Sequence, residues 1–173
     1  MESVAVPFIK YEVQSSQFKI NPDAMEFLQA IKTKVGVIAV CGKYRTGKSY
    51  LMNKLFLDCE TETQSTGFTV GPTINPCTKG LWIWKKLFYR KDDEDKEMPI
   101  IVIDTEGLGA FDEEQNHDTK IFLLAMLLCS LMIYNSVGPI DENALNNLSL
   151  VVNLSQSLQI KKGEDAIDAD EMA

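Results

Sequence analysis

Residues 35–49 read VGVIAVCGKYRTGKS, and this stretch decides the fold. Seven mostly apolar residues lead into Gly42, and the loop ends with the triplet GKS at Ser49. A segment suited to a helix follows directly at residues 50–56. Strand, G-x-x-x-x-G-K-S loop and helix, in this order, form the Walker A phosphate-binding loop in its expected context. Because the strand and the helix are both in place, the pattern favours a phosphate site over a Gly-Lys turn before an ordinary helix.

The spacing of this loop suits the phosphate tail of a nucleotide. Gly42 lets the backbone turn off the strand, and Gly47 lets it pass close to the phosphates, where a Cβ would collide. The loop N–H groups then form an anion nest at the helix N-terminus. We expect Lys48 to reach the β- and γ-phosphates and the Ser49 hydroxyl to ligate Mg²⁺. The predicted nucleotide-binding residues of the loop are Gly42, Lys43, Tyr44, Arg45, Thr46, Gly47, Lys48, Ser49 and Tyr50.

Composition and charge narrow the class of protein. The chain has 173 residues, 45% hydrophobic and 24% charged, which is typical of one globular domain. The net charge is −8 and no Lys/Arg-rich face appears, so nucleic acid is not expected as the main partner. Four cysteines without a C-x-x-C pair, together with a single histidine, argue against a structural zinc site. Cys41 and Cys129 lie in apolar runs and are predicted to be core thiols.

The sequence also suggests a location. It starts with neither a signal peptide nor a myristoylation site. Residues 121–133 are strongly apolar but too short to span a bilayer. We therefore expect a cytoplasmic protein with no transmembrane segment.

The remaining segments predict an α/β fold, a P-loop NTPase with a mostly parallel sheet flanked by helices and incomplete at the C-terminus. A GTPase-type domain is expected over residues 1–160, followed by an acidic, disordered tail at 161–173. The expected elements are strands near 8–9, 18–20, 35–41, 80–89, 99–103 and 129–134, and helices 23–32, 48–57, 117–128 and 141–159. The residues expected to face inward are Met25, Leu28 and Ile31 in the first helix, Leu51, Met52, Leu55 and Phe56 in the second, and Leu145, Leu148 and Val152 in the last.

Several of these segments have a more specific expectation. The strands at 80–89 and 99–103 are expected to pair as an antiparallel hairpin, the helix at 117–128 to be buried, and the strand at 129–134 to lie in the core. The connection at 58–79 is a long polar loop rich in threonine and is expected to be functional or disordered.

A second motif follows the apolar run at residues 99–103. Asp104 ends that run, and Gly107 stands three positions later, which is the D-x-x-G pattern of GTPase switch II. Asp104 would hold Mg²⁺ through water, and the Gly107 amide would sense the γ-phosphate. The motif lies 56 residues after Lys48 and at a strand end, so the pattern favours a switch over an ordinary turn.

Two further residues could serve the same site. Thr78 ends the long loop and could ligate Mg²⁺ as part of switch I, although taken alone it is one of several loop threonines. Arg45 lies inside the phosphate loop, where an arginine could neutralise charge in the transition state. Its alternative is a surface arginine paired with an acid.

These motifs resemble those of the guanylate-binding proteins, interferon-inducible large GTPases of the dynamin superfamily. Residues 42–55, GKYRTGKSYLMNKL, resemble their phosphate loop, and residues 78–84, TKGLWIW, resemble their switch I and the next strand. Residues 104–109, DTEGLG, resemble switch II, and residues 133–138, IYNSVG, resemble their next core strand. The match covers most of residues 8–155, and atlastins are more distantly similar.

The resemblance implies roles for individual residues. In that family the arginine matching Arg45 acts as an internal arginine finger, positioned when two GTPase domains meet face to face. The threonine matching Thr78 binds Mg²⁺, and the glutamate matching Glu106 belongs to the network around the attacking water. The resemblance thus implies catalytic roles for Arg45, Glu106 and Thr78, metal binding by Ser49, Thr78 and Asp104, GTP and GDP as ligands, and a nucleotide-dependent homodimer of the full-length protein.

The sequence departs from the family pattern in two places. Pro76 stands where the relatives carry a serine that helps to position the attacking water, and proline has neither a hydroxyl nor an N–H. No Arg-Asp pair that would read guanine follows residues 141–159, and no N-K-x-D motif is present. Three hypotheses remain: a Mg²⁺-dependent GTPase stimulated by self-association, an interaction module that binds GTP with little turnover, and a generic P-loop ATPase or kinase.

Overall fold

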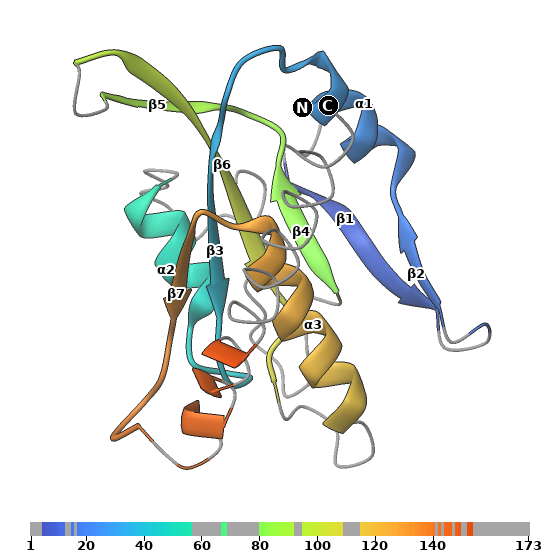
Figure 1. The fold of residues 1–173 in the computed structure, drawn as a ribbon, viewed down its shortest axis with the longest axis vertical. Coiled ribbons are helices and arrows are strands. Elements are labelled where there is room, and N and C mark those ends of the chain that lie inside the picture. Colours follow the sequence, from blue (N-terminus) through green and yellow to red (C-terminus); the bar gives the residue numbers. More distant parts are fainter. Residues whose placement is uncertain are drawn as a thin grey trace, which may run out of the picture. The chain divides into compact units, whose positions relative to one another are not determined.

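The computed structural model describes residues 5–12, 15, 17–56, 67–68, 80–91, 95–108, 115–140, 142, 144–146, 148–149 and 152–153 (Figure 1). The chain divides into two compact units, Met1–Val137 and Gly138–Ala173. The expectations for Pro76, Thr78 and the tail at 161–173 lie outside the described residues. None of the helices in the described ranges is long and apolar enough to cross a membrane.

The first unit holds strands and helices in an α/β order. In chain order they are β1 (Ala5–Glu12), β2 (Gln17–Ile20), α1 (Pro22–Ala30), β3 (Gly36–Cys41), α2 (Lys48–Leu55), β4 (Leu81–Trp84), β5 (Phe88–Lys91), β6 (Glu97–Thr105), α3 (Gln115–Leu128) and β7 (Leu131–Tyr134).

The strands of the described residues form one mixed sheet in the order β2-β1-β4-β6-β3-β7, with β5 pairing to β6 as well. β3 lies between β6 and β7 and runs parallel to both. The pairs β1–β2, β1–β4, β4–β6 and β5–β6 are antiparallel. The expected α/β class is confirmed. The sheet is mixed rather than mostly parallel, because among the described strands only the pairs of β3 with β6 and with β7 are parallel. The pairs β1–β2 and β5–β6 have the short connections that antiparallel strands allow.

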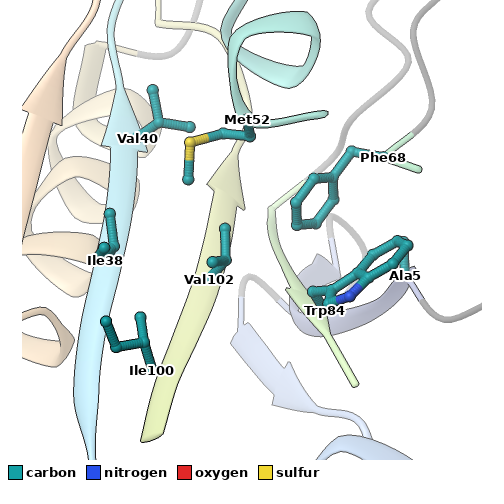
Figure 2. Packing of buried hydrophobic residues seen from close by; sticks show 8 residues of the cluster. All are labelled: Ala5, Ile38, Val40, Met52, Phe68, Trp84, Ile100 and Val102. Carbon is teal, nitrogen blue, oxygen red and sulfur yellow. The ribbon is translucent and has the colours of Figure 1, made fainter. Parts of the chain in front are cut away.

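The core next to the phosphate loop is built from alternate residues of β3 and β6. Ile38 and Val40 of β3 and Ile100 and Val102 of β6 face the same side, as the two-residue period of a strand requires. Met52 of α2 is fully buried against them (Figure 2). Ala5, Phe68 and Trp84 complete this cluster. The helix that follows the phosphate loop is thereby fixed to the two central strands.

Phe68 is tied to α2 by the side chain of Asn53. The Asn53 amide accepts from the Phe68 N–H at 2.8 Å and donates to the Phe68 carbonyl at 2.9 Å. The Phe68 ring is buried and lies 5.8 Å from the Trp84 ring, centroid to centroid. A point in the expected long loop is therefore held against both α2 and β4.

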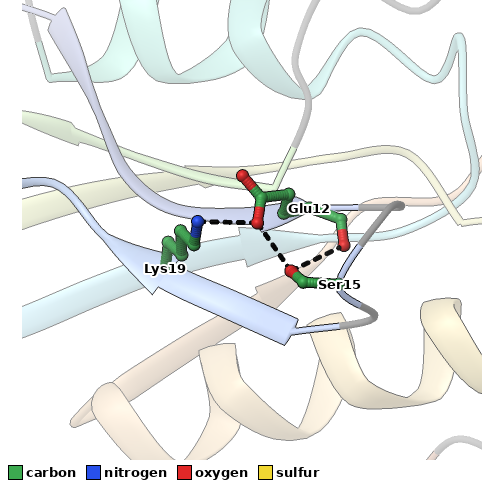
Figure 3. A network of polar contacts seen from close by, with 3 residues as sticks. All are labelled: Glu12, Ser15 and Lys19. Atoms are coloured by element: carbon green, nitrogen blue, oxygen red, sulfur yellow. Dashed lines mark hydrogen bonds and ion pairs between the residues drawn. The ribbon is translucent and has the colours of Figure 1, made fainter.

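The β1–β2 hairpin pairs Tyr11 directly with Phe18, and their rings lie 5.1 Å apart. Figure 3 shows the polar contacts at its turn, where Glu12 Oε2 accepts from Lys19 Nζ and from Ser15 Oγ, each at 2.6 Å. The hydrogen bond from Lys19, followed by that from Ser15, lowers the pKa of the Glu12 carboxyl. These contacts favour the register that pairs the two aromatic residues.

The predicted start of the first helix is confirmed. Asn21 caps α1, and its side chain accepts from the Asp23 N–H at 3.1 Å, with Pro22 as the first helical residue. The inward face differs from the prediction at Met25, while Leu28 and Ile31 are half-buried. Ala24 is the buried residue, and Met25 is 36% exposed. A small side chain at the contact lets this short helix approach β1 closely.

The predicted strand at 80–89 is wrong as a single element. It consists of two strands, β4 and β5, separated by a bend at the exposed residues Lys85 and Lys86. The expected antiparallel pairing with β6 is confirmed for both pieces. Two adjacent exposed charges favour a bend rather than a continued buried strand.

Several predicted inward faces and core positions are also wrong. Leu55 in α2 is 57% exposed, while Met52 on the same helix is fully buried. α3 buries Ile121, Phe122 and Ala125 but exposes Leu127, so it is buried on one face only. β7 has a paired strand on one side only within the described sheet, so it is not a core strand there.

The remaining corrections concern Cys129 and the second unit. Cys41 is fully buried as predicted, whereas Cys129 is only half-buried because it follows the end of α3. In the second unit Leu145 and Val152 are exposed and Leu148 is half-buried, so the predicted inward face is wrong at two of three positions.

The orientation of α2 gives a test of the fold. Replacing Met52 by alanine leaves a cavity between α2 and the central strands, so we expect the free energy of unfolding to fall by about 2–5 kcal/mol. Leu55→Ala is the matched control on the same helix, and we expect a change below about 1 kcal/mol because that side chain is largely in water. Urea denaturation measures both, and equal losses would contradict this orientation.

Candidate functional site

The phosphate loop has an unusual backbone that its glycines make possible. Gly42 has φ 143°, and a Cβ built there would lie 2.0 Å from the Asn135 carbonyl oxygen. Gly47, directly before the first turn of α2, has φ 81° and so lies in the left-handed region. Arg45 also has a positive φ, 60°, which is uncommon for a residue with a Cβ. The loop is thus held in one strained conformation at the carboxyl end of β3.

Lys48 is a buried cation at the start of α2. Only 6% of the residue is exposed, and its Nζ donates to the Lys43 carbonyl at 3.0 Å. Burial lowers the pKa of the Lys48 ammonium, and the charges of Asp104 and Glu106 act in the opposite direction. An ammonium group that is partly stripped of water interacts strongly with an anion brought close to it.

The two sequence motifs meet at a single hydrogen bond. The Ser49 hydroxyl donates to Asp104 Oδ2 at 2.5 Å, although 55 residues separate them in the chain. Asp104 is fully buried near the end of β6, and Ser49 is half-buried in the first turn of α2. The parallel pairing of β3 with β6 places Val40 opposite Asp104, which explains why these side chains meet.

The backbone after Asp104 is hydrogen-bonded to the phosphate loop. Tyr44 N–H donates to the Leu108 carbonyl at 3.0 Å, and Leu108 N–H donates to the Gly42 carbonyl at 3.0 Å. A Cβ on Gly107 would lie 2.3 Å from the Tyr44 Cα. Gly107 is therefore required by close contact between the two motifs, whatever its role toward a ligand.

Glu106, two residues after Asp104, binds the backbone of Gly80, directly before β4. Its Oε2 accepts from the Gly80 N–H at 2.7 Å, and its own N–H donates to the Gly80 carbonyl at 2.8 Å. His117 Nε2 lies 3.1 Å from the same Oε2. Gly80 is two residues after Thr78 in the chain, so Glu106 holds the residue that ends the expected switch I.

The other predicted loop residues lie at the surface. Arg45 is exposed, Tyr44 is 45% exposed and Tyr50 is 55% exposed. Thr46 is half-buried, and its hydroxyl donates to the Lys43 carbonyl at 2.9 Å. The structure thus separates a buried part of the loop, with Lys48 beside Asp104, from an outer part that carries Arg45.

Two residues of this site were missed by the sequence analysis. Asn135 Nδ2 donates to the Thr46 carbonyl at 2.8 Å and fixes the loop from the end of β7. The sequence could have indicated Asn135, because it is an amide side chain directly after an apolar strand, and α/β proteins bind ligands at the edge where their parallel strands end. His117 had no signal beyond being the one histidine of the sequence.

No group of three or more His, Cys, Asp or Glu side chains that could hold a metal occurs among the described residues. The hydrogen bond between Ser49 and Asp104 nevertheless places a hydroxyl and a carboxylate side by side, where the hydroxyl oxygen could ligate a cation directly and the carboxylate could hold it through water. Such a site would take its remaining ligands from a nucleotide and water, as Mg²⁺ sites in phosphate-transfer proteins do.

The comparison with known sequences agrees with this geometry. The family profile described as "Guanylate-binding protein, N-terminal domain" matches residues 15–173. This chain belongs to the guanylate-binding protein family. It is 39% identical over 168 residues to Guanylate-binding protein 1 of Mus musculus, covering 96% of this chain and 27% of that protein.

Other relatives give the same result. Guanylate-binding protein 3 of Homo sapiens is 37% identical over 168 residues, covering 96% of this chain and 27% of that protein. Guanylate-binding protein 5 of Mus musculus is 40% identical over 147 residues, covering 84% of this chain and 23% of that protein. The chain therefore spans about a quarter of the length of these guanylate-binding proteins.

The glycines of the loop give a test of its backbone. Gly42→Ala drives a Cβ into the Asn135 carbonyl, so we expect a loss of more than about 3 kcal/mol of folding free energy or failure to fold. Gly47→Ala is the matched control, because its φ is also positive but no atom lies within 4 Å of the new Cβ. We expect it to cost about 1–2 kcal/mol. Thermal or urea denaturation measures both, and equal costs would contradict the steric account.

Proposed function

We propose that this chain is the nucleotide-binding part of a Mg²⁺-dependent GTPase. The observation that carries the proposal is the 2.5 Å bond between Ser49 and Asp104 beside the buried Lys48. It brings together the residue types that phosphate-loop hydrolases use for phosphate and metal. Membership of a family named for guanylate binding supports guanine as the base.

The residues present fit a magnesium ion. Mg²⁺ prefers oxygen ligands, and the hydrogen bond from the Ser49 hydroxyl to Asp104 suits a site in which the Ser49 oxygen ligates the ion directly and Asp104 holds it through water. Ser49 and Asp104 would hold it, and Thr78 would add a third oxygen. When bound, Mg²⁺ neutralises charge on the phosphate oxygens.

Lys48 supports phosphate binding in the ground state. Its buried Nζ lies next to the loop carbonyl of Lys43, at the N-terminus of α2. The loop N–H groups and the helix terminus add positive potential at the same place. A phosphate chain arriving there would replace the interaction between Lys48 and the Lys43 carbonyl.

Arg45 and Glu106 are proposed to serve the chemistry in different ways. Arg45 is exposed, so its guanidinium would reach the phosphates only when another surface covers the loop. That requirement fits stimulation by self-association. Glu106 holds Gly80 from its buried carboxylate and would thereby position Thr78 two residues earlier.

A second candidate is a module that binds GTP and presents a surface with little turnover. Glu106 favours it, because Oε2 of this carboxylate is engaged by Gly80 and His117 rather than presented to water. Pro76, in place of a hydroxyl side chain, also favours it. Multiple-turnover phosphate release with GTP and Mg²⁺ separates the two candidates. Competition by ATP separates both from a generic phosphate-loop ATPase or kinase.

Two variants distinguish binding from chemistry. Lys48→Ala removes a charge that meets the phosphates in the ground state, so we expect nucleotide binding to be abolished. Arg45→Ala removes a charge needed mainly in the transition state, so affinity should change little while the rate falls by roughly 10³. Calorimetry and single-turnover hydrolysis over a range of protein concentrations measure both effects.

The outcomes that would contradict this assignment are specific. If Arg45→Ala weakens binding as much as Lys48→Ala, Arg45 is a ground-state phosphate ligand and not a finger. If the wild-type chain binds GTP but releases no phosphate at any concentration, the second candidate replaces the first.

A further inference from the structure

His117 occupies a defined position between the N-terminal hairpin and switch II. The residue is 9% exposed, and its ring lies 4.8 Å from the Tyr11 ring and 6.2 Å from the Phe18 ring, nearly parallel to the latter at 14°. Nε2 of the same ring lies 3.1 Å from Glu106 Oε2. The imidazole thus packs on two aromatic rings while one edge points at the carboxylate.

The contact with His117 matters because it uses the same Glu106 oxygen that binds Gly80. Oε2 accepts from the Gly80 N–H at 2.7 Å, in a position where the carboxylate is almost entirely buried. The tautomer with the proton on Nε2 makes His117 the donor and the carboxylate the acceptor, and the role proposed below for His117 rests on this tautomer. Two donors that converge on one oxygen fix the rotamer of the carboxylate more strictly than one donor does.

The position of Gly80 matters because Thr78, the proposed Mg²⁺ ligand, lies just before it in the chain. Gly80 has φ 75°, and a Cβ there would lie 2.1 Å from the Ile9 carbonyl oxygen, so this residue is closely packed on β1. Thr78 is two residues away, and consecutive Cα atoms are about 3.8 Å apart. The position of Gly80 therefore limits the region that the proposed Mg²⁺ ligand can reach.

We propose that His117 of α3, which packs on Tyr11 and Phe18 of the β1–β2 hairpin, is a positioning residue that orients the Glu106 carboxylate and so fixes the Gly80 end of switch I. Its effect on hydrolysis rests on the proposed function, whereas its effect on the Gly80 hydrogen bond does not. Tyr11 and Phe18 thereby reach the site through the His117 ring, in addition to the direct packing of β1 on Gly80.

The test compares two substitutions in the full chain. His117→Leu removes the donor and keeps an apolar side chain between the aromatic rings. His117→Gln keeps a donor at about the same reach. We expect His117→Leu to lower kcat by about 10–100-fold, since a small misplacement of catalytic groups costs this much. The KM for GTP should stay within about threefold, because the phosphate loop is unchanged, and His117→Gln should recover most of kcat.

A second readout does not depend on hydrolysis. Amide hydrogen exchange at Gly80, measured by NMR, reports the bond from its N–H to Glu106 Oε2. We expect exchange at Gly80 to become at least about tenfold faster in His117→Leu, and to stay close to wild type in His117→Gln. Exchange at Leu108, whose N–H bonds to the Gly42 carbonyl, is the internal control and should not change.

Each possible result either supports or overturns the positioning role of His117. Unchanged Gly80 exchange in His117→Leu would overturn it, and so would a loss of kcat in His117→Gln equal to that in His117→Leu. If the wild-type chain hydrolyses no GTP, the proposed function fails. In that case faster exchange at Gly80 in His117→Leu alone would still support the positioning role of His117, and unchanged exchange would refute it.

Discussion

The site depends on the parallel pairing of β3 with β6. This pairing sets Val40 opposite Asp104 and brings the carboxyl ends of two strands to one edge of the sheet. The phosphate loop leaves one strand there and the D-x-x-G segment leaves the other. The contacts between the two motifs follow from it: Ser49 to Asp104, Tyr44 to Leu108, and the close approach of Gly107 to Tyr44. A slip in this register would separate the two motifs.

Burial then decides which side chains can act in the ground state. Lys48 and Asp104 lie away from water, and burial lowers the pKa of Lys48 while the carboxylate opposes that shift. Interactions with an anion or a metal are stronger there than at the surface. Arg45 differs because it is exposed on the outer part of the loop. The structure therefore divides one short motif into a buried binding part and a surface part suited to meeting a second molecule.

The sequence predicted the parts of the molecule whose local pattern and tertiary environment agree. The strand, loop and helix at residues 35–55, the cap at Asn21 and the strand ending at Asp104 all carry strong local signals, and the structure confirms them. The errors arise where tertiary packing selects among equivalent side chains. Leu55 and Met25 are as apolar as the buried residues beside them, and only the docking geometry decides which face turns inward. Asn135 and His117 were missed because the partners that define their positions, Thr46 for the first and the Tyr11 and Phe18 rings for the second, are distant in sequence.

The most direct test of the central claim is whether Ser49 and Asp104 act as one metal site. The measurement is the Kd for GTP with Mg²⁺ and with a chelator, for wild type, Ser49→Ala, Asp104→Asn and the double variant. The account predicts that Mg²⁺ tightens binding to wild type and that each single variant loses most of this gain. The double variant should lose little more, because contacting groups are not additive. Losses that simply add, or a gain from Mg²⁺ that survives in either single variant, would contradict it.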